Sequence, residues 1–258
     1  MTQPPAHPHA AHPPAASDAP PLDIREKGGP KDGQPQYSDK RLFVSLTAFT
    51  GCRDARALAA GLKGGADVDY VVYEEASDPA GVAVLAMTAE PDALISVARR
   101  DLASGPFAGL TLKPEFSMLG RTYALGYEPK LEDWLLERTR RVTRDAQAPW
   151  AVWYPLRRTG AFARLPRPEQ QQILKEHGQI GRRFGDAGLA HDVRLACHGL
   201  DKNDNDFVIG LIGKDLAPLS ILVETMRATV QTSQYLAALG PFFVGRAVWT
   251  SPVRGEAK

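Results

Sequence analysis

One histidine lies on the apolar stripe of a helix that is otherwise polar. Residues 167–185 predict an amphipathic helix with Pro168 near its start. Its stripe consists of Ile173, His177, Ile180 and Phe184. Gly178 and Gly181 remove side chains where a flat group could approach. A neutral imidazole that projects from a helix into an apolar cavity is how proteins supply a proximal haem ligand. The alternative is a core histidine hydrogen-bonded to a backbone carbonyl.

A second candidate group lies on the predicted strand over residues 189–199. One face is mostly apolar and carries Leu189, His191, Val193, Leu195 and Cys197. The other face carries Ala190, Asp192, Arg194, Ala196 and His198. If the apolar face packs on helices, Asp192, Arg194 and His198 point into the barrel described below. Asp192 and Arg194, about 7 Å apart along the strand, could pair with each other or flank a bound oxidant. The alternative is a solvated, salt-bridged strand face.

Arginines gather on either side of an aromatic segment, residues 150–156. They are Arg138, Arg140, Arg141 and Arg144 before it, and Arg157 and Arg158 directly after it. Guanidinium groups bind carboxylates or phosphates bidentately. Two such clusters beside a cavity would suit a ligand with several carboxylates, and the alternative is a solvated charged surface. Cys197, on the apolar face of its strand, is expected to be a buried packing residue.

Composition excludes several classes of protein. The chain has 258 residues, with 31 Lys+Arg against 30 Asp+Glu and a formal net charge of +1. That balance argues against a dedicated nucleic-acid or anionic-membrane binder. Two cysteines cannot form a disulfide framework. No apolar run is long enough for a transmembrane helix, and the N-terminus lacks the features of a secretory signal. We therefore expect a soluble cytoplasmic protein without membrane insertion.

The first forty residues differ from the rest of the chain. They contain nine of the 21 prolines, and Tyr37 is their only aromatic residue. Such a segment buries too little apolar surface to offset its ordering entropy, so we expect residues 1–40 to be a disordered tail. Its histidines His7, His9 and His12 could bind a metal ion weakly, or could simply belong to a proline-rich tail.

The remaining chain predicts the same order of elements twice. In residues 41–145, strands are expected at 41–49, 68–76, 81–89 and about 115–124, with helices at 53–63 and 91–104. In residues 146–258, strands at 150–156, 189–199, 206–213 and 242–249 alternate with helices at 167–185 and 216–230. Two βαββαβ units predict two ferredoxin-like halves. Packing their free sheet faces together gives an α+β barrel with room for a ligand in the second half.

Several segments of the second half resemble the chlorite dismutase-like haem protein family. They are WAVWYPLRRTGAF, EHGQIGRRF, CHGLDKNDNDFVIGLIGKDL and LGPFFVGRAVW. The branch of peroxide-dependent coproheme decarboxylases is the most similar, and the first half matches in architecture alone. The resemblance implies a dimeric α+β barrel within one chain, assembled as a homo-oligomer that in this family is often a pentamer.

The family's motifs imply roles for individual residues. The EHGxIGR motif places the proximal iron ligand at His177. The YPxxK motif appears as residues 154–158, so Tyr154 matches the tyrosine that forms a radical and abstracts hydrogen from a propionate. Arg158 replaces the usual lysine and keeps the positive charge. Arg140 matches a propionate-binding arginine, and Arg141 is nearly as good a candidate.

The distal position departs from the family's pattern. Seven residues before Gly199, the decarboxylases carry glutamine and the chlorite dismutases carry arginine, whereas this sequence has Asp192. The missing arginine argues against chlorite decomposition unless Arg194 takes its place. Asp192 could act as a general base for peroxide. It could equally coordinate or repel a distal ligand.

Three readings follow from the resemblance. The first is a haem-dependent oxidoreductase that uses hydrogen peroxide to convert coproheme to haem b, so that iron coproporphyrin III is both substrate and cofactor. The second is a chlorite dismutase or general haem peroxidase, for which Arg194 is the discriminating residue. The third is a non-enzymatic haem carrier or sensor. A barrel without haem, in which His177 is a core residue, is the remaining alternative.

Overall fold

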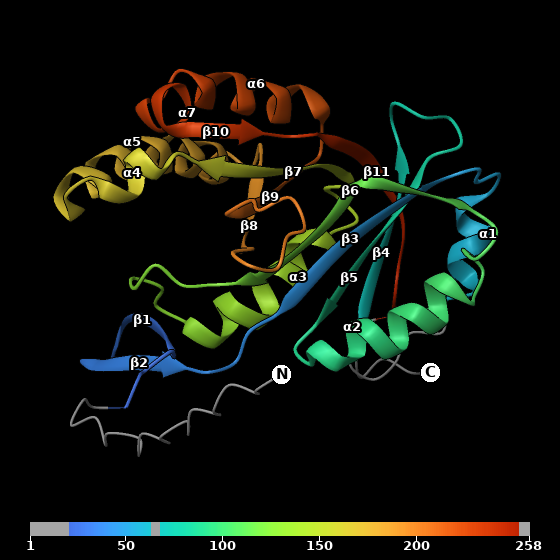
Figure 1. Ribbon diagram of the computed structural model, residues 1–258, viewed down its shortest axis with the longest axis horizontal. Coiled ribbons are helices and arrows are strands. Elements are labelled where there is room, and N and C mark those ends of the chain that lie inside the picture. Colours follow the sequence, from blue (N-terminus) through green and yellow to red (C-terminus); the bar gives the residue numbers. More distant parts are fainter. Residues whose placement is uncertain (1–20, 63–67, 253–258) are drawn as a thin grey trace, which may run out of the picture.

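The computed structural model describes residues 21–62 and 68–252, so the histidines of the predicted tail lie outside the described residues. Two βαββαβ units follow each other along the chain (Figure 1). The first comprises β3 (Phe43–Thr50), α1 (Ala55–Ala60), β4 (Asp69–Glu75), β5 (Val82–Thr88), α2 (Pro91–Ala98) and β6 (Thr111–Thr122). The second comprises β7 (Trp150–Arg158), α5 (Arg167–Asp186), β8 (His191–Ala196), β9 (Phe207–Gly213), α6 (Leu216–Arg227) and β11 (Phe243–Thr250).

Shorter elements flank these units. They are β1 (Glu26–Lys31), β2 (Gln34–Ser38), η1 (Arg99–Ala103), η2 (Asp133–Glu137), α3 (Arg138–Thr143), α4 (Gly160–Arg164), α7 (Val230–Tyr235) and β10 (Leu236–Leu239). Both η elements are π-helical turns. None of the helices in the described part of the chain is both long and apolar enough to cross a membrane.

The strands close into a barrel. Neighbouring strands follow the order β7-β11-β4-β5-β3-β6-β8-β9, and a further pairing joins β9 to β7. Within each half the first strand lies between the third and the fourth, which is the ferredoxin-like arrangement. The pairings β4–β11 and β6–β8 join the two halves. The predicted fold class, two ferredoxin-like units in one dimeric α+β barrel, is therefore confirmed.

The inside of the barrel is the largest apolar core. Trp153, Phe243 and Leu85 are among its fully buried side chains. The helices lie outside, with α1 and α2 over the first half and α5, α6 and α7 over the second (Figure 1). Because side chains fill the barrel, a ligand site of the second half has to lie between its sheet and its helices.

The orientation of β8 differs from the prediction. Val193, Leu195 and Cys197 are buried in the barrel core, whereas Asp192 and Arg194 lie on the outer, helix-covered face. The prediction that the polar face of this strand points into the barrel is wrong. The physical reason is that the barrel interior, shared by both halves, buries more apolar surface than the helix layer and so takes the more apolar face of the strand.

Part of the predicted tail is ordered. β1 and β2 form an antiparallel hairpin, which corrects the expectation of disorder for residues 26–38. Polar contacts hold it. Glu26 accepts hydrogen bonds from Arg41 and Arg121, and the Gln36 amide donates to the carbonyls of Glu128 and Pro129. Composition alone missed the hairpin because hydrogen bonds to the body, rather than an apolar core of its own, stabilise it.

The two thiols should differ sharply in reactivity. Cys197 is fully buried, and burial raises the pKa of its thiol to about 12. Cys52 is half-buried. Because the thiolate is the reactive form, we expect the native protein at pH 8 to release one equivalent of thionitrobenzoate with Ellman's reagent, and two equivalents in guanidinium chloride. The Cys52→Ser variant should release none when folded. Two fast thiols in the native protein would contradict the position of Cys197.

Candidate functional site

Helix α5 presents His177 toward the outer face of the second half. The helix has proline in its first turn, which suits the fixed φ of that residue. It ends before Gly188, whose φ of 66° is the left-handed conformation of a helix terminus. Ile173 is buried, and Ile180 and Phe184 are half-buried against the apolar cluster of β7, β9 and α6. The predicted stripe is confirmed, and it points at the sheet.

His177 is a neutral imidazole near two cations. Burial, followed by the nearby Arg158 and Arg194 guanidinium groups, lowers the pKa of His177 to about 4. A neutral ring is the form that binds a metal ion. Its Nδ1 lies 3.4 Å from the Thr229 hydroxyl oxygen. At Gly178 an added Cβ would meet no atom of another described element within 4 Å, so packing against the described residues does not require this glycine.

Tyr154 lies on the same outer face of β7. It is 8% exposed, and its ring stacks on Phe242 with centroids 4.6 Å apart. Burial, with a contribution from Asp192, raises the pKa of the phenol above its ordinary value. Across the sheet, Tyr154 pairs with Ile209, and Ile209 pairs with Arg194. Tyr154 and Arg194 are therefore two strands apart, roughly 10 Å, on one surface.

Among the residues that the structure describes, Arg158, at the end of β7, forms no ion pair with a carboxylate. Its guanidinium lies over the rings of Phe162 and Phe207, at 4.7 and 4.6 Å from their centroids. Its Nε atom is buried and has no hydrogen-bond partner among the described residues. Burial lowers the pKa of this guanidinium. A desolvated donor left unpaired is costly, so this position is suited to an anionic group of a ligand.

Asp192 lies between two guanidinium groups. Its Oδ1 is 3.1 Å from Arg138 Nη2, and its Oδ2 is 2.9 Å from Arg194 Nε. Arg138 also donates to the Asp192 carbonyl. Both arginines stack over Trp134, at 4.6 Å for Arg138 and 5.3 Å for Arg194. To serve as a general base, Asp192 would have to give up part of an ion pair, and the same pair holds Arg194 in place.

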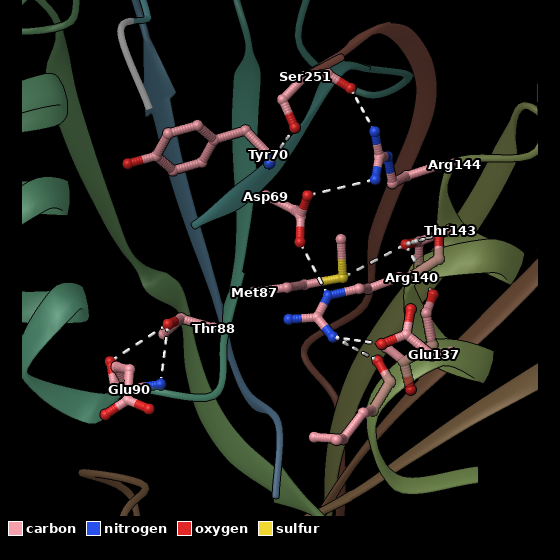
Figure 2. Close-up of polar contacts among 12 residues, drawn as sticks. Asp69, Tyr70, Met87, Thr88, Glu90, Glu137, Arg140, Thr143, Arg144 and Ser251 are labelled. Atoms are coloured by element: carbon pink, nitrogen blue, oxygen red, sulfur yellow. Dashed lines mark hydrogen bonds and ion pairs between the residues drawn. The ribbon is translucent and has the colours of Figure 1, made fainter. Parts of the chain in front are cut away.

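The other predicted arginines of this segment lie elsewhere. Arg140 donates to Asp69, at 2.8 Å, and to the Leu136 carbonyl. Figure 2 shows this network, in which Arg144 reaches the second oxygen of Asp69. Arg141 pairs with Asp133 at the surface. The structure therefore does not bring Arg140 or Arg141 to His177, and the arginine of α3 that reaches the site is Arg138.

Three contributors to the site were not predicted as such. Arg138 was one of a cluster and could be singled out only by knowing the rotation of α3. Thr229 lies in the short connection between α6 and α7, where no periodic pattern marks it. Phe242 follows Pro241 and precedes Phe243. Because neighbouring residues of a strand point to opposite faces, this aromatic pair could have indicated one ring in the barrel and one ring at the site. Phe243 is buried in the barrel, and Phe242 stacks on Tyr154.

The arrangement fits an iron porphyrin. It offers one neutral imidazole, an arginine whose buried Nε has no hydrogen-bond partner in the described part of the chain, and an apolar surface formed by strands and helices of the second half. An imidazole can bind the metal, while guanidinium groups can bind carboxylate substituents bidentately. The buried phenol of Tyr154 lies on the same surface. His177 lies close enough to Arg158 for that cation to lower the pKa of the ring, and Tyr154 lies on the same side of the sheet; their roles in a porphyrin site stay predictions.

Comparison with solved structures agrees with this architecture. A haem-binding protein from Thermus thermophilus is 20% identical, with a TM-score of 0.62 over 81% of this chain and 91% of that one. A double mutant of chlorite dismutase from Candidatus Nitrospira defluvii is 13% identical, with a TM-score of 0.64 over 83% and 93%. The same enzyme in complex with imidazole is 15% identical, with a TM-score of 0.60 over 83% and 93%. At these identities the similarity shows the fold.

Fold and site together define a single-chain dimeric α+β barrel with a histidine-bearing helix over its second half. The family model for chlorite dismutase matches residues 52–248. The chain therefore belongs to the chlorite dismutase family. No curated protein sequence matches it.

Proposed function

We propose that this protein binds iron coproporphyrin III through His177 and uses hydrogen peroxide to convert propionate groups to vinyl groups. The family includes haem-dependent enzymes. The observation that carries the proposal is the half-buried Arg158, whose buried Nε has no hydrogen-bond partner among the described residues, beside a neutral His177 and a buried Tyr154. An anionic macrocycle with a central metal ion would give Arg158 a carboxylate partner and His177 a metal ion to bind.

The reaction balances without another oxidant. Each propionic acid side chain loses carbon dioxide and two hydrogens to become a vinyl group, and one hydrogen peroxide takes up those hydrogens to form two waters. The bound iron supplies the peroxide chemistry. Arg158 holds a propionate, and Tyr154 relays one hydrogen atom from the propionate side chain. Burial raises the pKa of the Tyr154 phenol and so keeps it protonated. The phenol therefore holds the hydrogen atom that such a relay would give up and regain.

The Tyr154→Phe variant tests the relay. We expect it to bind iron coproporphyrin III with an unchanged Soret band and to yield no decarboxylated product by mass spectrometry after peroxide is added. Tyr123→Phe is the matched control, because Tyr123 is also half-buried and near Arg158 and Arg194, and it should keep the activity. Normal turnover by Tyr154→Phe would rule out the radical role.

Chlorite decomposition is a second candidate because one observation favours it. Arg194 is close enough to lower the pKa of His177, so a cation is present although residue 192 is an aspartate. This alternative predicts oxygen release from chlorite by the wild-type protein and loss of that release in Arg194→Ala. Porphyrin binding without either product would instead support a carrier or sensor. A homo-oligomer and a cytoplasmic location stay predictions.

A further inference from the structure

Thr229 lies behind His177, in the connection between α6 and α7. It is 2% exposed and is the N-cap residue of α7. Its Oγ1 lies 3.4 Å from His177 Nδ1. In the described part of the chain the other ring nitrogen, Nε2, forms no hydrogen bond with the protein. The two nitrogens of His177 are therefore distinguished by one buried hydroxyl.

The hydroxyl hydrogen of Thr229 has nearer acceptors than His177. Oγ1 lies 2.8 Å from the Met226 carbonyl oxygen and 3.3 Å from Thr232 Oγ1, and we assign the hydrogen to the carbonyl, which is the shorter contact and can only accept. The Thr232 backbone N–H also donates to Oγ1. Toward His177, Thr229 can offer only a lone pair. The imidazole must then carry its hydrogen on Nδ1, which leaves the lone pair of Nε2 free.

A second hydrogen bond joins α5 to the first residue of α7. Glu176 Oε2 accepts a hydrogen bond of 3.0 Å from the Val230 backbone N–H. Two consecutive residues of α5 thus contact Thr229, the N-cap residue of α7, and Val230, the first residue of that helix. These two contacts fix the position of α5 along its axis relative to Thr229. As a result, the atom of the His177 ring that lies next to the hydroxyl is Nδ1.

We propose that Thr229 is a positioning residue whose hydroxyl selects the Nδ1–H form of His177 and so presents Nε2 as the ligand atom. For the ligand role this rests on the proposed function, whereas the tautomer belongs to the protein without porphyrin. A hydroxyl is a weaker acceptor than a carboxylate, and the partner of a ligating histidine tunes its basicity. His177 is therefore a neutral imidazole ligand with little imidazolate character.

The tautomer can be measured without porphyrin. In the apoprotein labelled with ¹⁵N-histidine, long-range proton–nitrogen correlation at pH 7.5 should show His177 with a protonated Nδ1 and an unprotonated Nε2. Thr229→Ser keeps the hydroxyl and should give the same spectrum. Thr229→Val should shift the ring toward the Nε2–H form. Asp215→Ala, which removes the N-cap hydrogen bond of α6, controls for the loss of a cap and should leave His177 unchanged.

The loaded protein gives a second readout. Thr229→Asp places a carboxylate behind the ring, so we expect a higher iron–imidazole stretching frequency in the ferrous complex and a lower reduction potential than in the wild type. Thr229→Val should shift the stretching band the other way. An Nε2–H ring in the wild-type apoprotein, or a Thr229→Val spectrum identical to the wild type, would overturn the proposal. If the wild type binds no porphyrin, the proposed function fails, and the apoprotein spectra still decide the role of Thr229.

Discussion

The His177→Ala variant should lose tight binding of iron coproporphyrin III. Changing a partner of a metal ligand costs 10- to 100-fold in affinity, so removing the ligand itself should raise the Kd by more than about 100-fold. The α5 face should remain folded, because His177 is only half-buried and Ile180 and Phe184 keep their contacts. Titration of the Soret band, with far-ultraviolet circular dichroism for folding, measures both effects.

Imidazole and a second histidine provide the controls for that experiment. Added imidazole should restore part of the Soret shift in His177→Ala, because the cavity left by the ring can admit it. His191→Ala changes a histidine that β8 places on its barrel side, and it should bind porphyrin as the wild type does. Equal affinity of His177→Ala and the wild type would show that the iron is held elsewhere.

The Asp69→Ala variant should be severely destabilised. Asp69 is 2% exposed and holds both Arg140 and Arg144 by ion pairs of 2.8 and 3.2 Å (Figure 2). Arg144 in turn donates to the Ser251 carbonyl near the end of β11. Removing one partner of a buried pair leaves uncompensated charge, which costs about 3–5 kcal/mol. Urea unfolding followed by tryptophan fluorescence measures this loss in the free energy of unfolding.

An exposed pair in the same part of the chain is the matched control. Asp133 and Arg141 form a bidentate pair, with side chains 42% and 60% exposed. Such pairs contribute less than about 1 kcal/mol, so Asp133→Ala should unfold close to the wild-type midpoint. Similar losses for both variants would mean that Asp69 is not the buried counterion. A large loss in Asp69→Ala alone would show that the buried pairs with Arg140 and Arg144 stabilise the fold.

The fold could be predicted from the sequence because each half repeats a strongly periodic pattern. Alternation in β3 and the four–three–four spacing in α5 mark one buried face each, and the repeated order of elements predicts the barrel. The same spacing identified His177, and the motif around Tyr154 and Arg158 placed both on one strand. These features depend on local geometry, which the order of residues determines directly.

What the sequence could not determine depends on packing between elements. Choosing Arg138 rather than Arg140 requires the rotation of α3, and the π-helical turn η2 directly before it disturbs the regular period of 3.6 residues. Which face of β8 enters the barrel depends on competition between two apolar layers. The hairpin at residues 26–38 depends on partners such as Arg121 and Glu128, which are about ninety residues away.

The two junctions between the halves differ in length. β11 and β4 pair over five residue pairs, whereas β6 and β8 share only two, Arg121 with Ala196 and Thr122 with Leu195. Backbone pairing between the halves is therefore extensive at β4–β11 and short at β6–β8. Asp192 and Arg194 belong to β8, a strand of the short junction. A small separation of β8 from β6 would move the carboxylate and guanidinium of the site while each half kept its own sheet intact.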